Sequence, residues 1–300
     1  MDMTQNKCCR HGANLRRRRR RRRKILRSII FSCSIIAVAV FVAVGSRMIT
    51  SGDGGTNRYD VEAGNNTYDN VVIKNSKISE KNKIQNNQSM LDDIMNSTQY
   101  PKQLKDLALK NEEALEFVYD YPAEHVKEHT IDLTEEASMD SVPLFVQWDK
   151  RWGYEKYSGN FFAASGCGPT TLSMVVVYLT HNREASPIAV AKYSKEAGYS
   201  VDGSGSSWTL ISEGCRHYGV KAKTVALDES RMKAELDAGH PIVINVGPGD
   251  FTDTGHFMVI TGYDDEGFSI NDPNSIEKSG KRWLFRNISS QIRAVWSMYV

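Results

Sequence analysis

The stretch SGCGPTTLSMVVVYL, residues 165–179, sets one cysteine at the point where a loop is expected to become a helix. Apolar residues recur at i, i+3, i+4 and i+7 from Leu172 to Leu179, which predicts an amphipathic helix with one face toward a core. Pro169 suits the first turn of such a helix, where its missing N–H costs nothing. Cys167 then lies at the positive end of the helix dipole, which favours thiolate over thiol. The pattern indicates a nucleophile, and a buried, unreactive cysteine is the alternative.

The sequence after this helix predicts further helices and then strands. Ser186-Pro187 and Asp228 are N-cap signals for two further helices, and Gly198 and Gly239 are placed to end them. Apolar runs then predict four strands over residues 241–246, 256–263, 268–272 and 295–300, separated by short turns rich in Gly and Asp. Helices followed by an antiparallel sheet with short connections define an α+β domain.

A cysteine nucleophile requires a base, an acceptor that orients the base, and donors for the oxyanion. His256 begins one predicted strand and Asp272 ends the next, so a hairpin between the strands would bring the two side chains together. Strand alternation sends Asn271, the competing acceptor, to the opposite face. Gln147 could donate to the oxyanion beside the Cys167 N–H, or it could simply pack in the core.

The N-terminal region has a different composition from the rest of the chain. Residues 1–50 hold thirteen Lys or Arg and one Asp, a net charge of +12, whereas the remaining residues carry a net charge of −10. The basic run from Arg16 to Arg23 is soon followed by an uncharged apolar run from Ser28 to Gly45, close to the length that crosses a bilayer as a helix. Basic residues beside such a run stay in the cytoplasm, so the main body of the protein is expected outside. A cleaved secretory signal is the alternative.

We therefore expect five parts along the chain. These are a basic cytoplasmic segment (1–27), a transmembrane helix (28–49), a disordered linker (50–99), a helical lead-in segment (100–141) and a folded domain (142–300). Within the lead-in segment, apolar spacing predicts one helix over residues 101–118. The expected localisation is the cell membrane, with a single span, the N-terminus in the cytoplasm and the folded domain outside. We expect a monomer, and no nucleic-acid partner, because the membrane segment accounts for the arginine run.

Only two of the five cysteines, Cys167 and Cys215, are expected outside the cell, where an oxidising environment could join them. The helical spacing of Trp208, Ile211, Cys215 and Tyr218 instead assigns Cys215 to the core face of a second helix. No Cys/His cluster has the spacing of a metal site. We expect neither a metal nor a cofactor.

Four segments, VPLFVQWDKRWG, SGCGPTTLSMVV, GHFMVITGYD and INDPN, occur in this order between residue 142 and the end of the chain. In these segments the sequence resembles the papain-like cysteine peptidases of the C39-like family. The resemblance implies a papain-like fold, with Cys167 as nucleophile, His256 as general base and acid, Asp272 as the residue that orients the histidine, and Gln147 as an oxyanion donor. No cofactor or metal takes part in that mechanism.

The function expected from these observations is that of a membrane-anchored, extracytoplasmic cysteine peptidase that hydrolyses peptide or amide bonds of a peptide or protein substrate. Two alternatives stay open. If an amine replaces water as the acceptor, the same triad makes a transpeptidase or acyltransferase. A catalytically inactive module that binds peptides or cell-wall ligands would keep the fold and lack the reactive thiol.

Overall fold

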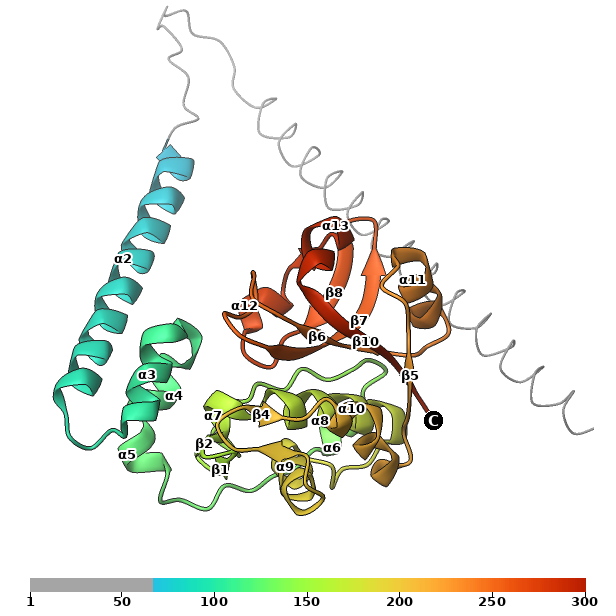
Figure 1. Ribbon diagram of the computed structural model, residues 1–300. Coiled ribbons are helices and arrows are strands. Elements are labelled where there is room, and N and C mark those ends of the chain that lie inside the picture. Colours follow the sequence, from blue (N-terminus) through green and yellow to red (C-terminus); the bar gives the residue numbers. More distant parts are fainter. Residues whose placement is uncertain (1–66) are drawn as a thin grey trace, which may run out of the picture. The chain divides into compact units, whose positions relative to one another are not determined.

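The fold is built around helix α8 (Cys167–Thr180), which packs against a six-stranded antiparallel sheet and is flanked by further helices (Figure 1). The computed structural model describes residues 67–300, with side chains from residue 81 onward. Residues 71–300 form one compact unit.

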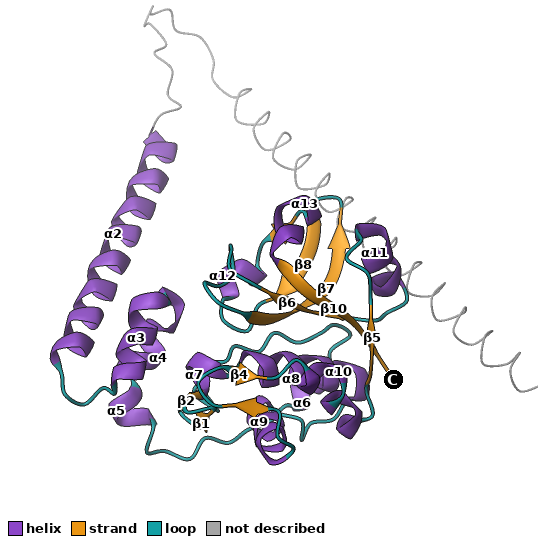
Figure 2. Cartoon of the chain, in the orientation of Figure 1, coloured by secondary structure: helices purple, strands orange, loops and turns teal. Residues whose placement is uncertain are grey.

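The helices that precede residue 241, drawn purple in Figure 2, fall into three groups. The first group begins with α2 (Thr67–Asn96), in the predicted linker, and continues through the lead-in segment with α3 (Lys102–Lys110), η1 (Glu112–Ala114), α4 (Leu115–Tyr119), α5 (Tyr121–Glu124) and α6 (Thr134–Ser138). The central group holds α7 (Phe162–Ser165), α8 and α9 (Pro187–Glu196), and the third holds α10 (Thr209–Ser212), η2 (Gly214–Tyr218) and α11 (Glu229–Asp237). Two short ribbons accompany them, β1 (Lys156–Tyr157) with β2 (Asn160–Phe161), and β3 (Ser200–Val201) with β4 (Gly205–Ser206).

The large sheet has the strand order β5-β10-β6-β7-β8-β9, and every neighbouring pair in it is antiparallel. Its strands are β5 (Lys221–Thr224), β6 (Ile242–Val246), β7 (His256–Asp264), β8 (Gly267–Asn271), β9 (Arg282–Trp283) and β10 (Ile292–Tyr299). Three short helices connect the last strands: α12 (Ile276–Ser279), α13 (Phe285–Ile288) and η3 (Ser289–Gln291). The prediction of an α+β domain, with helices packed on an antiparallel sheet, is confirmed.

Strand alternation divides the apolar side chains of the sheet between two cores. In β6, Val243 joins the core that contains the α8 side chains, whereas Ile242 and Ile244 join a second core with Met232 of α11 and Ile288 of α13. Both faces of the sheet are therefore covered. Successive side chains of a strand point to opposite faces, so a strand that is apolar at every position needs a core on each side.

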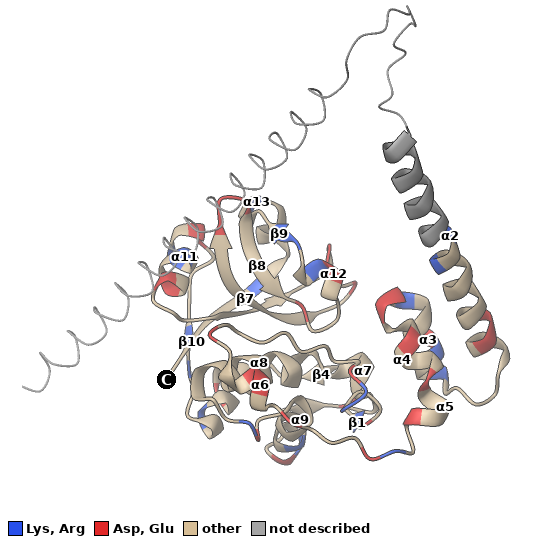
Figure 3. Ribbon diagram, turned by 180° about the vertical axis from the view of Figure 1, so that it is seen from behind, with Lys and Arg blue, Asp and Glu red and all other residues tan. Residues whose placement is uncertain are grey.

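Helix α8 is buried more completely than the predicted amphipathic stripe implies. Every residue from Gly168 to Val177 is buried, and α8 contacts β7 on one side and α9, α6 and α10 on others. The helix carries no charged residue, whereas the outer helices carry many (Figure 3). A helix enclosed by a sheet and three other helices has no exposed face to keep polar.

Two predictions about the lead-in region require correction. The linker expected to be disordered over 50–99 is helical from Thr67 to Asn96, where Ile94 is fully buried and Met90 and Leu91 pack against the same apolar cluster. The single helix predicted over 101–118 is interrupted at Asn111, which has an extended backbone between α3 and η1. In both places tertiary contacts override the local pattern.

Within residues 67–300, no helix is sufficiently long and apolar to span a membrane. The basic segment (1–27), the predicted transmembrane helix (28–49) and residues 50–66 of the predicted linker lie outside the described residues.

Candidate active site

Cys167 is the first residue of α8 and follows Gly166, the N-cap. Its side chain is partly exposed, although the helix behind it is buried. Pro169 occupies the first turn of α8, as predicted. The sulfur therefore lies at the positive end of a helix of 14 residues, which stabilises a negative charge.

Glycines on both sides of Cys167 allow neighbouring elements to approach it closely. A Cβ on Gly166 would lie 2.6 Å from the ring of Phe162, and a Cβ on Gly168 would lie 2.5 Å from Ser206 Oγ in β4. Such approaches are closer than real Cβ contacts, so a larger residue at either position would push α7 or β4 away.

His256 and Asp272 meet because β7 and β8 form the predicted hairpin. His256 is the first residue of β7, and Asp272 follows the last residue of β8. The distance from His256 Nε2 to Asp272 Oδ1 is 2.7 Å, and the two residues are 6% and 1% exposed. A buried, charge-assisted hydrogen bond of this length fixes the plane of the imidazole ring.

The Asp272 carboxylate is itself held by its own turn. Its Oδ1 also accepts a hydrogen bond from the Asn274 N–H at 2.8 Å, and its backbone N–H donates to Ser279 Oγ at 2.9 Å. The second oxygen, Oδ2, is buried without a partner among the described residues. Asn271, the competing acceptor, lies on the opposite face, where its Nδ2 donates to the backbone oxygens of Val142 and Pro143.

The imidazole of His256 also acts on the Cys167 thiol, through hydrogen bonding and through its charge, as the pKa values of both groups show. Burial tends to raise the pKa of Cys167, but the hydrogen bond and charge of His256, together with the N–H groups of Phe257 and Gly168, lower this pKa below its usual value. Burial tends to lower the pKa of His256, but Asp272 and then Cys167 raise it to about 10. The arrangement favours a thiolate and an imidazolium.

Gln147 lies beside this group. Its side chain is 4% exposed, and Nε2 donates to the backbone oxygen of Ala163 in α7 at 2.7 Å. Its backbone N–H donates to the oxygen of Pro273, the residue after Asp272, also at 2.7 Å. Gln147 therefore connects the turn of Asp272 to the helix that precedes Cys167, and its Oε1 is buried without a partner within the described part of the chain.

The family model described as "Peptidase_C39 like family" matches residues 139–300 of this chain. The chain belongs to this family of peptidases.

Two solved structures resemble the chain at low sequence identity. The peptidase domain of Streptococcus ComA, described as a bi-functional ABC transporter involved in a quorum sensing pathway, is 19% identical, with a TM-score of 0.37, and the match covers 45% of this chain and 90% of that one. A putative C39-like peptidase from Bacillus anthracis is 17% identical, with a TM-score of 0.34 and coverage of 53% and 95%. A search of curated proteins found no match.

The second cysteine of the C39-like domain, Cys215, is free and fully buried in the same core as α8, so the alternative of a Cys167–Cys215 disulfide is wrong. Burial raises the pKa of Cys215 to about 11. The helix expected to carry it is divided at Glu213 into α10 and η2, and Trp208 is 47% exposed rather than on a core face. The two thiols thus differ in both access and acidity.

The other described histidines of the chain have different partners. They contact the ring of Tyr121 (His125), Glu124 (His129), the oxygen of Ala137 (His181), the ring of Tyr193 (His217) and Glu235 (His240). Among residues 67–300, no group of three His, Cys, Asp or Glu side chains could hold a metal ion.

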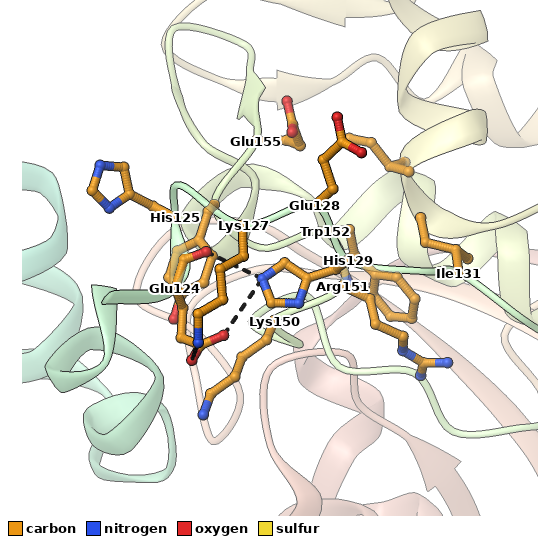
Figure 4. A pocket seen from close by; sticks show the side chains of 12 residues that line it. Glu124, His125, Lys127, Glu128, His129, Ile131, Lys150, Arg151, Trp152 and Glu155 are labelled. Carbon is orange, nitrogen blue, oxygen red and sulfur yellow. Dashed lines mark hydrogen bonds and ion pairs between the residues drawn. The ribbon is translucent and has the colours of Figure 1, made fainter. Parts of the chain in front are cut away.

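A surface hollow of about 380 Å³ lies between α5 and the loop before β1 (Figure 4). Its cationic side chains are already paired: Lys127 with Glu124, Lys150 with Asp120, and Arg151 with Glu136 and Asp149. None of the residues lining it belongs to the Cys167 group of the C39-like domain.

Proposed function

We propose that the chain is a cysteine-type peptidase whose nucleophile is Cys167. The observation that carries this proposal is the position of His256, which is held by Asp272 through Nε2 at 2.7 Å and interacts with Cys167 strongly enough to lower the pKa of its thiol. Membership of a peptidase family supports the same conclusion.

The proposed reaction begins when the Cys167 thiolate attacks the carbonyl carbon of a peptide bond, and an S–C bond forms as the carbonyl oxygen becomes an oxyanion. Gln147 Nε2, which has a second hydrogen beyond the one given to Ala163, and the N–H of Cys167 are the proposed donors to that oxyanion. The imidazolium of His256 then gives its proton to the leaving amine as the C–N bond breaks.

Hydrolysis of the thioester completes the cycle. Neutral His256 takes a proton from water, the resulting hydroxide attacks the acyl carbon, and the S–C bond breaks to release a carboxylic acid and the Cys167 thiolate. Asp272 keeps the ring oriented and stabilises its charged form throughout. Every step uses side chains of this chain and water.

The decisive experiment combines a substitution with a labelling measurement on the full chain. We expect Cys167→Ala to abolish cleavage of a peptide library without changing the melting temperature by more than a few degrees, whereas Cys215→Ala, the matched control, retains cleavage. In the wild type, iodoacetamide near neutral pH should modify Cys167 rapidly and leave the buried Cys215 unmodified. Cleavage that survives in Cys167→Ala would remove this residue from the mechanism.

The same assay tests the fate of the acyl group. Mass spectrometry of the products, with and without an added amine, should detect free carboxylic acids in both cases if water is the acceptor. Products joined to the amine would instead identify a transferase.

We further propose that the peptidase domain is held at the outer surface of the cell membrane by residues 28–49 as a monomer. The support is the sequence alone: the apolar run from Ser28 to Gly45 and the arginines before it. Protease added to intact cells should remove the domain and spare the segment 1–27. Protection of the whole chain would contradict this topology.

A further inference from the structure

Residues 100–138 of the lead-in segment lie outside the residues that match the family, 139–300, yet Asn111 and Glu113 contact the turn that follows Asp272. Apolar side chains of α3, η1 and α4 form one cluster with Phe161 and Ala163, which flank the start of α7. From this cluster, Asn111 and Glu113 reach the turn after Asp272. The segment is therefore anchored on both sides of the candidate active site.

Glu113 caps the short helix that follows Asp272. Its carboxylate accepts hydrogen bonds from the N–H of Ile276 at 2.7 Å, the N–H of Glu277 at 3.1 Å, and the hydroxyl of Ser275. The two N–H groups belong to the first turn of α12, where they have no partners within the helix. A carboxylate at this point satisfies them and fixes where the turn ends.

Asn111 continues a path of hydrogen bonds to the imidazole. Its Nδ2 donates to the backbone oxygen of Asn274 at 2.9 Å and to Asn274 Oδ1 at 3.1 Å. The N–H of Asn274 donates to Asp272 Oδ1 at 2.8 Å, the same oxygen that holds His256 Nε2 at 2.7 Å. Asn111 also caps η1, because its Oδ1 accepts from the N–H of Glu113 at 3.0 Å.

These contacts hold the turn from which the Asp272 carboxylate projects, and that carboxylate has hydrogen-bond partners at Oδ1, namely His256 and the N–H of Asn274. Asp272 Oδ2 has no partner among the described residues, so the direction of the carboxylate depends on Oδ1 and on the backbone of its turn. A shift of this turn changes the distance from Asp272 to His256 and therefore the charge state of the imidazole.

We propose that Asn111 and Glu113 are positioning residues for the catalytic group, acting through the turn 272–277, so that the lead-in segment completes the active site of the C39-like domain. The proposal rests on the proposed function, because the effect is transmitted through Asp272 to His256 and Cys167. It assigns a role in the reaction to a part of the chain that the family match does not include.

The test compares two substitutions with a matched control in the full chain. Glu113→Gln removes the charge that caps α12, and Asn111→Ser keeps a cap for η1 while its shorter side chain loses the contact with Asn274. Glu116→Gln is the control. Glu116 is an exposed residue of α4, so this substitution removes the same charge without changing a contact to the turn. We expect kcat to fall about tenfold or more in the first two variants with KM little changed, since displacements of about 1 Å at catalytic groups can cost about 100-fold.

The pH profile distinguishes positioning from a general loss of stability. Weaker contact with Asp272 lowers the pKa of His256, so the high-pH limb of kcat/KM should move to lower pH in Glu113→Gln and Asn111→Ser but not in Glu116→Gln. A lower melting temperature with an unchanged pH profile and unchanged kcat would overturn the proposal and leave only a structural role.

A double substitution separates this inference from the proposed function. If Glu113 acts through Asp272, Glu113→Gln as a single substitution should slow iodoacetamide labelling of Cys167. Added to Asp272→Ala, the same substitution should have no further effect on the labelling rate. Equal slowing in both backgrounds contradicts the path through Asp272. Slow labelling of Cys167 in the unmodified chain would instead contradict the proposed function itself.

Discussion

The thiol of Cys167 and the ring of His256 have pKa values moved in opposite directions, lowered for the thiol and raised to about 10 for the imidazole. The thiolate and the imidazolium therefore coexist over a wide interval of pH. We expect kcat/KM to rise through the lowered pKa of Cys167 and to fall only as the pH approaches about 10. A pH–rate profile checks this, and a decline that begins near pH 6.5, the ordinary value for histidine, would contradict the raised pKa.

A comparison of Asp272 with its neighbour Asn271 tests the role of the Asp272 carboxylate. Asp272→Ala removes the charge that raises the pKa of His256, so the high-pH limb should move to lower pH and kcat should fall by at least about tenfold. Asn271→Ala is the control, because its side chain bonds the segment at Val142 and Pro143 instead of His256. It should lower the free energy of unfolding and leave the pH profile unchanged; equal profiles for both variants would contradict the assignment of Asp272.

At this scale local sequence pattern points to Cys167, His256 and Asp272 as candidates, but not to the residues that contact the turn after Asp272. Cys167, His256 and Asp272 are recognisable because each stands at the end of an element whose local pattern is clear. Asn111 and Glu113 are separated from the turn they hold by more than 160 residues. No local spacing of residues encodes such a contact. From the sequence alone, a polar residue between two helices indicates only that one helix ends there.

Among the elements, the junction of α8 with β4 has little room for a larger residue. Gly168→Ala would bring a methyl group to 2.5 Å from Ser206 Oγ and 2.7 Å from its Cβ, so we expect a loss of about 1–3 kcal/mol in the free energy of unfolding and a large loss of activity. Gly262→Ala in β7, where nothing lies within 4 Å of the added methyl, should be nearly neutral. Urea unfolding and peptide cleavage measure both effects.

Removal of the opposing side chain tests the cause. Ser206→Gly combined with Gly168→Ala should restore part of the lost stability, since the methyl then has space. A double variant as unstable as the sum of the single ones would show that the strain does not come from this contact.

Elements with strong local signals were predicted well. Ser186 and Asp228 cap α9 and α11 through their side chains, and Gly198 and Gly239 adopt positive φ after them. The predictions failed for elements that depend on tertiary contacts. The C-terminal part of α2 packs against the apolar cluster of α3 and α4, and its sequence before that part has few large apolar residues. The strand β5 (KAKT) has no strand pattern of its own and forms by pairing with β10. Local propensity carries little information about such elements.

For the whole molecule, Glu235 links three elements, because its carboxylate accepts from His240, from Ser297 in β10 and from Lys223 in β5. Its hydrogen bond with His240 is the main reason that its pKa is lowered to about 2. A lowered pKa in the folded state contributes stability above the unfolded value of about 4.5, and this contribution is lost as the pH falls toward about 2.

Unfolding in urea at several pH values tests this link. Glu235→Gln should lower the free energy of unfolding by about 1–3 kcal/mol at pH 6, and the difference from the wild type should shrink as the pH is lowered below 4.5. Glu229→Gln serves as the control, since its pairing with Lys233 lies at the surface and contributes little. A difference that stays constant down to pH 3 would contradict the lowered pKa.

The position of β10 has a consequence for biosynthesis. This strand follows all the others in the chain, yet it lies between β5 and β6 in the sheet. While the nascent chain is still attached to the ribosome, the surface on which α8 rests is incomplete even after Asp272 has been translated. We therefore expect arrested nascent chains that end before residue 292 to show no rapid alkylation of Cys167, so that the reactivity of this thiol depends on the synthesis of β10.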